Sequence, residues 1–177
     1  GDAMTTGNRN TALGYSALSS DTLGDRNVAI GNLALQTQNF TSSTDSYNTA
    51  VGYNAGGVVT TGIQNTLIGG LAGDAITTAS YNTAVGYTSL SANTTGADNV
   101  AIGWAALGAN TTGSDNVAVG KQALDANTTG ATNTALGDRA LTTNTTASNN
   151  TAVGADALYA NTTGSDNVVV GAVAGDA

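Results

Sequence analysis

The 177-residue sequence contains no Cys, His, Pro or Glu. Without His and Cys, the chain lacks the usual ligands of structural zinc, haem and iron–sulfur clusters. It also lacks the commonest general base and the thiol nucleophile, and it can form no disulfide. We therefore predict that the protein is not an enzyme, and we expect no catalytic residues, no metal and no cofactor.

Charged and bulky apolar residues are scarce as well. Four Lys and Arg residues stand against 12 Asp, a net charge of −8, and only 5% of the residues are aromatic. An acidic surface repels phosphate groups, so we expect no nucleic-acid partner. No stretch approaches the roughly 18 consecutive apolar residues of a membrane span, so we expect no membrane insertion. The few large side chains can fill only a thin core.

Ala, Thr, Gly and Asn are abundant, with 31, 30, 24 and 20 copies, and they form a tandem repeat. A pentapeptide, Asn-(Thr/Val)-(Ala/Leu/Val)-(Val/Ile/Leu)-Gly, recurs every 17 residues, with a single step of 21 residues between its second and third copies. This period predicts one structural unit per repeat and a single domain over residues 1–177, cut from a longer fibre. The ten copies begin at Asn10, Asn27, Asn48, Asn65, Asn82, Asn99, Asn116, Asn133, Asn150 and Asn167.

The repeat is too short for two helices, and its fixed Gly and Thr/Asn cluster are poor helix formers. In the pentapeptide, Val100 and Ile102 alternate with Ala101 and Gly103, as on the two faces of a strand. We predict an all-β parallel solenoid with one coil per repeat, each built as strand, turn, strand, turn. The larger aliphatic side chains should form an inner ladder, and the fixed Asn should form a second ladder at a corner.

Four extra residues lie between Asn27 and Asn48. Turns tolerate insertions, whereas an insertion within a strand would turn its inward side chains outward. We therefore expect a protrusion around residues 38–46, with Ile30 and Val51 still in register.

The pentapeptides NVAIG, NTAVG and NVAVG resemble the head repeat of YadA-like trimeric autotransporter adhesins. The segment NTLIGGLAGDAITT, residues 65–78, is similar to arrays in tail-fibre and other virion proteins of marine bacteriophages. The adhesin repeats are shorter, so the extra residues here should enlarge a turn. The resemblance implies a left-handed parallel β-roll, three chains side by side as a homotrimer, an extracellular location and attachment to cell surfaces. It implies no catalytic residue.

We accordingly expect a structural and adhesive shaft of a phage tail fibre or other virion fibre, which binds a glycan or protein on the host cell surface. The head of a bacterial trimeric autotransporter adhesin, displayed on the cell surface, is the alternative. A minor alternative is an ice-binding solenoid, because the Thr-Thr pairs recur in register. Adjacent side chains of a strand point to opposite sides, which argues against that alternative.

Two residue sets are candidates for contact. Aromatic residues at the sixth repeat position could offer flat platforms to sugar rings, or could cap the strand ends and cover a seam between chains. They are Tyr15, Tyr53, Tyr87 and Trp104. The small-residue face of the strands could contact neighbouring chains of a trimer, or could pack against the coil's own second segment. Its members include Ala84, Ala101, Ala118, Ala135 and Ala152.

Other polar repeats favour simpler roles. Asp98, Asp115 and Asp166 precede the pentapeptide, but other residues interrupt their column. The spacing lacks the order of calcium-binding β-roll repeats, so we expect solvated turn residues. The Asn-Thr-Thr tripeptides match N-glycosylation acceptors, but the repeat itself explains their recurrence.

Overall fold

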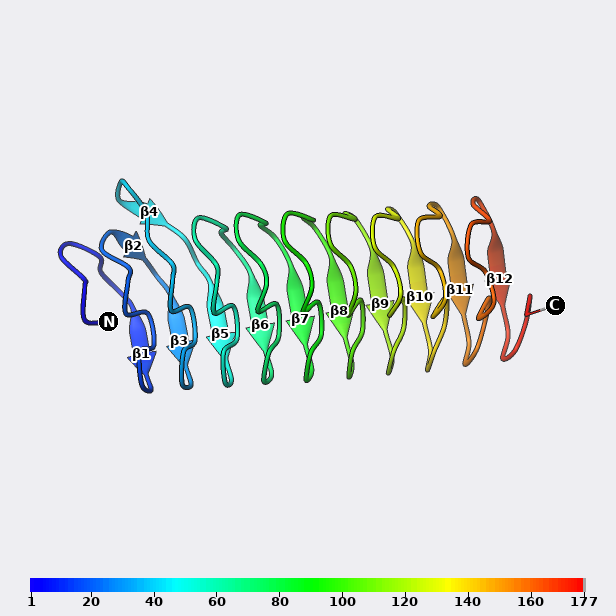
Figure 1. Ribbon diagram of the computed structural model, residues 1–177, viewed down its shortest axis with the longest axis horizontal. Coiled ribbons are helices and arrows are strands. Elements are labelled where there is room, and N and C mark those ends of the chain that lie inside the picture. Colours follow the sequence, from blue (N-terminus) through cyan, green and yellow to red (C-terminus); the bar gives the residue numbers. More distant parts are fainter. Residues whose placement is uncertain (177) are drawn as a thin grey trace.

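The computed structural model describes residues 1–176. The chain forms a parallel β-solenoid of about nine coils with about 17 residues per turn, and no described residue is helical. The coils stack into an unbranched rod with the two termini at opposite ends (Figure 1). The predicted fold class is confirmed.

Ten strands of three residues each form one parallel sheet in the order β1-β3-β5-β6-β7-β8-β9-β10-β11-β12. Each strand pairs with the equivalent residues of the next coil, so that Val85 lies beside Ile102 and Ile102 beside Val119. The predicted register is therefore confirmed. The strands are Thr11–Leu13 (β1), Val28–Ile30 (β3), Thr49–Val51 (β5), Thr66–Ile68 (β6), Thr83–Val85 (β7), Val100–Ile102 (β8), Val117–Val119 (β9), Thr134–Leu136 (β10), Thr151–Val153 (β11) and Val168–Val170 (β12).

The two faces of the sheet are the reverse of the prediction. Ala101, the central residue of β8, is fully buried inside the coil, whereas Ile102 is 39% exposed on the outer face. The predicted inner ladder of Val, Ile and Leu is therefore wrong. The interior is so narrow that a methyl group fills the space beneath most strands, and the larger side chains point outward.

In the described residues, the Ala-Leu segment of each coil does not form the second strand that was predicted there. Ala106 and Leu107 do close the core opposite the strand, both fully buried. However, they lie in a turn, because Ala105 and Leu107 have φ of 55° and 51°, in the left-handed region. This backbone still bonds to the next coil, the Leu107 N–H donating to the Ala123 carbonyl at 3.0 Å.

The third and ninth repeat positions share the core volume. Most coils place Ala at the third repeat position and Leu at the ninth, both buried. In the coil that begins at Asn65, Leu67 takes the third position and Gly73 the ninth. A Cβ on Gly73 would lie 2.8 Å from Leu67 Cδ2 and 2.8 Å from Ile76 Cδ1. Val169 and Gly175 repeat this exchange in the last coil.

The predicted Asn ladder is confirmed, and Asn116 shows its geometry. The fully buried Asn116 Oδ1 accepts the backbone N–H of Asn133 at 3.0 Å and the Asn133 side-chain amide at 3.2 Å. Its own Nδ2 donates to Asn99 Oδ1 at 3.2 Å and to the Gly130 carbonyl at 2.9 Å. Each amide therefore joins neighbouring coils and satisfies buried backbone groups.

Replacing Asn116 with Ala should lower the free energy of unfolding by about 2 kcal/mol or more, because the buried N–H of Asn133 loses its acceptor and the Gly130 carbonyl loses one of its two donors. Asn32 is exposed, has no left-handed φ and makes no side-chain hydrogen bond with any described residue, so Asn32→Ala should change the free energy of unfolding by less than about 0.5 kcal/mol. Urea unfolding followed by circular dichroism measures both variants. Equal losses for the two would contradict the role assigned to the ladder.

The insertion behaves as predicted. Ile30 pairs with Val51 across it, so the register is kept. Its tip, residues 41–43, is exposed, and it is anchored by the buried Gln38 and Phe40 on one side and by the buried Ser46 on the other. The loop adds a short parallel pair, β2 (Gly24–Asp25) with β4 (Thr44–Asp45). The loop beside β4 rises above the line of coils in Figure 1.

Candidate functional site

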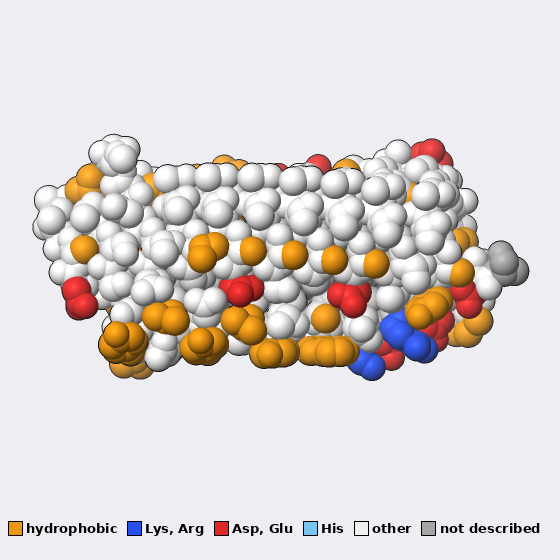
Figure 2. Space-filling view, in the orientation of Figure 1, with side chains coloured by type: hydrophobic (Ala, Val, Ile, Leu, Met, Phe, Trp, Pro, Cys, Tyr) orange, Lys and Arg blue, Asp and Glu red, His pale blue; other side chains and the backbone are white. Residues whose placement is uncertain are grey.

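The predicted aromatic contact residues lie along one edge of the rod. The Gly that ends each strand, for example Gly103 with φ of 136°, turns the chain at this edge and places the sixth repeat residue outside. Tyr15, Tyr53, Tyr87 and Trp104 are 76%, 58%, 57% and 47% exposed. Figure 2 shows hydrophobic side chains in a row along the lower edge, toward which the strands point in Figure 1.

Neighbouring side chains complete this edge. The Tyr87 ring covers Gly70, where an added Cβ would lie 3.4 Å from Tyr87 Cδ2. In the coil after Trp104, the Lys121 ammonium lies 5.6 Å from the centroid of the Trp104 ring, within range of a cation–π interaction. Lys121 is exposed and forms no ion pair with any described residue, whereas Arg139 pairs with Asp156 at 2.9 Å. Asp138 takes the sixth position of the next coil.

The outer face of the sheet is a second surface, which sequence reasoning missed. The fourth repeat position carries in-register aliphatic side chains throughout, and the second position carries Val in four of the ten repeats. The exposed members include Val117 (36% exposed), Ile68 and Ile102 (39% each) and Leu136 (46%). One signal could have revealed it. The second position holds Thr in six of the ten repeats, and such a mixture of Thr and Val is typical of an exposed face.

The trimer face assigned to the alanines is wrong. Ala84, Ala101, Ala118, Ala135 and Ala152 are all fully buried within their own coils. They therefore pack against the coil's second segment, the alternative that the sequence left open. An Ala101→Arg substitution would disrupt the core of its own coil, so a loss of assembly in that variant would not identify a contact between chains.

Two further tyrosines, Tyr47 and Tyr81, are exposed, and the sequence analysis did not predict them as contact residues. Each directly precedes the fixed Asn of a pentapeptide. Beside Tyr47, the Arg26 guanidinium lies 5.4 Å from the ring centroid and donates to Asp45 at 2.6 Å. That hydrogen bond raises the pKa of Arg26. These contacts tie the base of the inserted loop to the preceding coil.

The Asn-Thr-Thr turns form a second internal ladder. Asn110 is fully buried and donates to Asn93 Oδ1 at 2.9 Å and to the Gly113 carbonyl at 2.9 Å. The Asn110 amide is therefore inaccessible to glycosylation. The hydroxyl of Thr111 donates to the Thr128 carbonyl at 2.9 Å, whereas Thr112 is exposed. One threonine of each pair thus joins the coils and the other faces solvent.

The carboxylates are dispersed. Asp98, Asp115 and Asp166 are exposed, as expected, and no group of three or more Asp side chains in residues 1–176 could hold a metal ion. Burial raises the pKa of Asp74 and of Asp125 above the usual value. Because their protonated forms are favoured in the folded state, these groups stabilise the rod as the pH falls through their raised pKa values.

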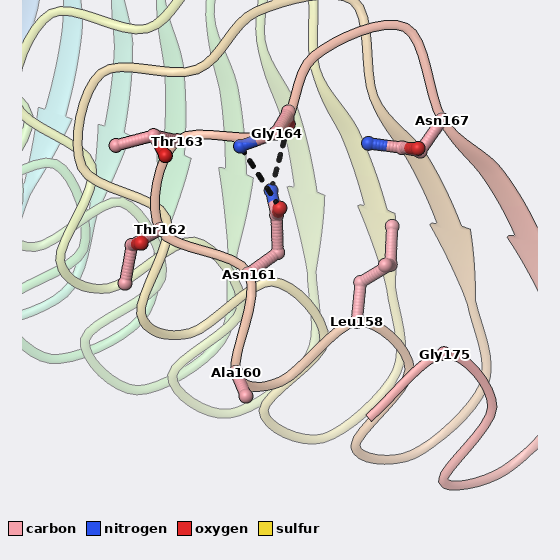
Figure 3. Close-up of a pocket in the computed structure, with 8 residues that line it drawn as sticks. All are labelled: Leu158, Ala160, Asn161, Thr162, Thr163, Gly164, Asn167 and Gly175. Atoms are coloured by element: carbon pink, nitrogen blue, oxygen red, sulfur yellow. Dashed lines mark hydrogen bonds between the residues drawn. The ribbon is translucent and has the colours of Figure 1, made fainter. Parts of the chain in front are cut away.

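A hollow of about 360 Å³ lies at the C-terminal end of the coil stack (Figure 3). Its lining residues include Asn161, Gly164 and Asn167. In the preceding coil, Asn144 Oδ1 accepts the Asn161 amide at 3.2 Å. The Asn161 Oδ1 instead accepts the Gly164 N–H at 3.1 Å, within its own turn. The hollow therefore lies at the end of the Asn ladder that the Asn-Thr-Thr turns form.

No described segment is a helix that could cross a membrane. Comparisons with models of protein families, with curated proteins and with solved structures found no match to this chain.

Proposed function

We propose that this chain is a non-enzymatic, structural and adhesive shaft of a bacteriophage tail fibre or other virion fibre, which attaches the particle to a host cell surface. The observation that carries the proposal is the unbranched stack of in-register coils that holds exposed aromatic residues along one edge. Each coil bonds only to its neighbours, so a rod of this kind grows in length by simple repetition. The exposed row offers repeated contacts to a glycan or protein of the host surface.

Attachment is tested with the fluorescently labelled chain and a panel of intact bacterial strains. We expect saturable binding to at least one strain, and competition by unlabelled chain. Binding to no strain, or binding that unlabelled chain does not displace, would contradict an adhesive function.

The same rod would serve as the head of a bacterial trimeric autotransporter adhesin, because the resemblance of the repeats extends to that family. Both candidates are extracellular, but the first is part of a virion and the second is displayed on a bacterial cell surface. An antibody against the rod should label virions in immunogold microscopy if the first proposal holds. Labelling of bacterial envelopes alone would favour the adhesin head.

Assembly as a side-by-side homotrimer belongs to this proposal. The outer sheet face supports it, because aliphatic side chains such as Ile102 and Leu136 remain partly exposed in register along the rod. Contiguous exposed apolar patches of this kind mark interaction surfaces. Burying this face against two other copies would supply the apolar contacts that a narrow core of Ala and Leu cannot provide.

Ile102→Lys should disrupt this assembly. In sedimentation equilibrium we expect the unmodified chain at three times its 17.2 kDa mass, and the variant at lower mass. Thr112 is exposed on another edge, so Thr112→Lys should leave the mass unchanged. Circular dichroism of each variant separates loss of assembly from loss of folding. A folded wild-type species at 17.2 kDa would contradict the trimer.

A further inference from the structure

We propose that Tyr87, Trp104 and Lys121 form a binding site for the flat face of a neutral hexose unit, in a linear polysaccharide that runs along the rod. This inference rests on the adhesive function proposed above and names its ligand class. The three side chains occupy the same repeat position in three consecutive coils. Successive coils are about 4.8 Å apart, so the side chains form one continuous surface.

The two rings provide the platform. Tyr87 and Trp104 are 57% and 47% exposed, so roughly half of each side chain is open to a ligand. Tyr87 covers the bare backbone at Gly70, with its Cδ2 3.4 Å from the position of an added Cβ. The Lys121 ammonium lies over the Trp104 ring, 5.6 Å from its centroid, at the end of a flexible side chain. The platform therefore combines apolar ring surface with hydrogen-bond donors.

This chemistry matches a hexose better than an apolar partner. A pyranose ring with equatorial hydroxyls presents C–H groups on its two faces, and these pack against the electron-rich face of an aromatic ring. Its hydroxyls project from the rim, where Lys121 can donate to them. Asp138, in the following coil, offers a carboxylate acceptor.

Charge and register select the kind of glycan. The chain carries a net charge of −8, which repels acidic polysaccharides and favours a neutral one. Tyr53 lies on the same edge, two coils before Tyr87, with only Gly70 between them. A glycan that follows the rod axis reaches Tyr53 as well, so a longer chain gains additional contacts.

Trp104 is the single tryptophan, so its fluorescence reports directly on this site. Cellohexaose and chitohexaose, titrated separately into the full chain, are the probes. We expect at least one hexaose to give a saturable change in emission, at least about tenfold tighter than its monosaccharide. Tyr87→Ser should weaken that affinity about tenfold, a loss of about 1.4 kcal/mol. Lys121→Met, which keeps the apolar stem, should weaken it less.

Tyr81→Ser is the matched control, because Tyr81 is 50% exposed but lies at a different repeat position. It should bind as tightly as the wild type, and circular dichroism should show all variants folded. The inference is overturned if neither hexaose changes the emission at about 10 mM, or if Tyr87→Ser binds as tightly as the wild type. A rod that binds cells but neither hexaose keeps its adhesive function and loses this site. A rod that binds a hexaose but no cells keeps this site and loses the proposed adhesive function.

Discussion

Gly103→Ala is expected to lower the free energy of unfolding by about 3 kcal/mol or more. Gly103 has φ of 136°, a conformation that residues with a Cβ rarely adopt. An added Cβ would lie 2.4 Å from the carbonyl oxygen of Gly120 in the next coil. That atom is backbone held by the ladder, so relief of the clash requires separation of the coils.

Gly108→Ala is the matched control in the same coil. Gly108 does not have a left-handed φ, and the nearest atom to its added Cβ is the side-chain Oδ1 of Asp125, which can rotate away. We expect a change of less than about 1 kcal/mol. Urea unfolding at one protein concentration measures both variants, and hydrogen exchange should locate the loss of protection in the coils around Gly103. Similar stability of the two variants would refute the assignment of Gly103 to a closed corner.

The exchange of size between Leu67 and Gly73 predicts a non-additive pair of substitutions. Leu67→Ala should cost about 2–5 kcal/mol, because it empties a core position with little room to relax. Gly73→Leu should cost about 1–3 kcal/mol, because its side chain would overlap Leu67 and Ile76. The double variant recreates the Ala and Leu pairing of other coils. Its cost should therefore be smaller than the sum of the single costs by at least about 1 kcal/mol.

The double variant should not regain the full stability of the wild type, because Leu67 also fills the space beside Gly56 and Leu67→Ala leaves that space empty. Leu67→Ala combined with Leu124→Ala is the additive control, since the two sites are more than three coils apart. Additivity of the Leu67 and Gly73 substitutions in urea unfolding would show that the two positions do not share one volume.

The sequence was sufficient to predict the fold class, the register and the position of the insertion. All three follow from spacing. A parallel ladder places each residue beside its equivalent in the next coil, so a 17-residue period specifies which residues pair, as Val85 does with Ile102. The Asn and Gly of the pentapeptide were also predictable as corner residues, because few other residues supply a short amide or tolerate a left-handed φ.

The candidate site was only partly predictable. The aromatic column followed from the period, and its four residues do lie exposed on one edge. The ammonium of Lys121 above Trp104 did not, because a side-chain contact depends on rotamers and on the path of the turn. The Tyr87 ring over Gly70 depends on the same factors.

The inward face of the strand was decided by tertiary structure alone. Alternation along a strand determines which side chains share a face, as Val100 and Ile102 do, but it does not determine which face lies inside. The width of the closed coil settles that choice. With Leu107 and two Asn ladders already in the interior, only the methyl of Ala101 fits beneath the strand, and the larger side chains face outward.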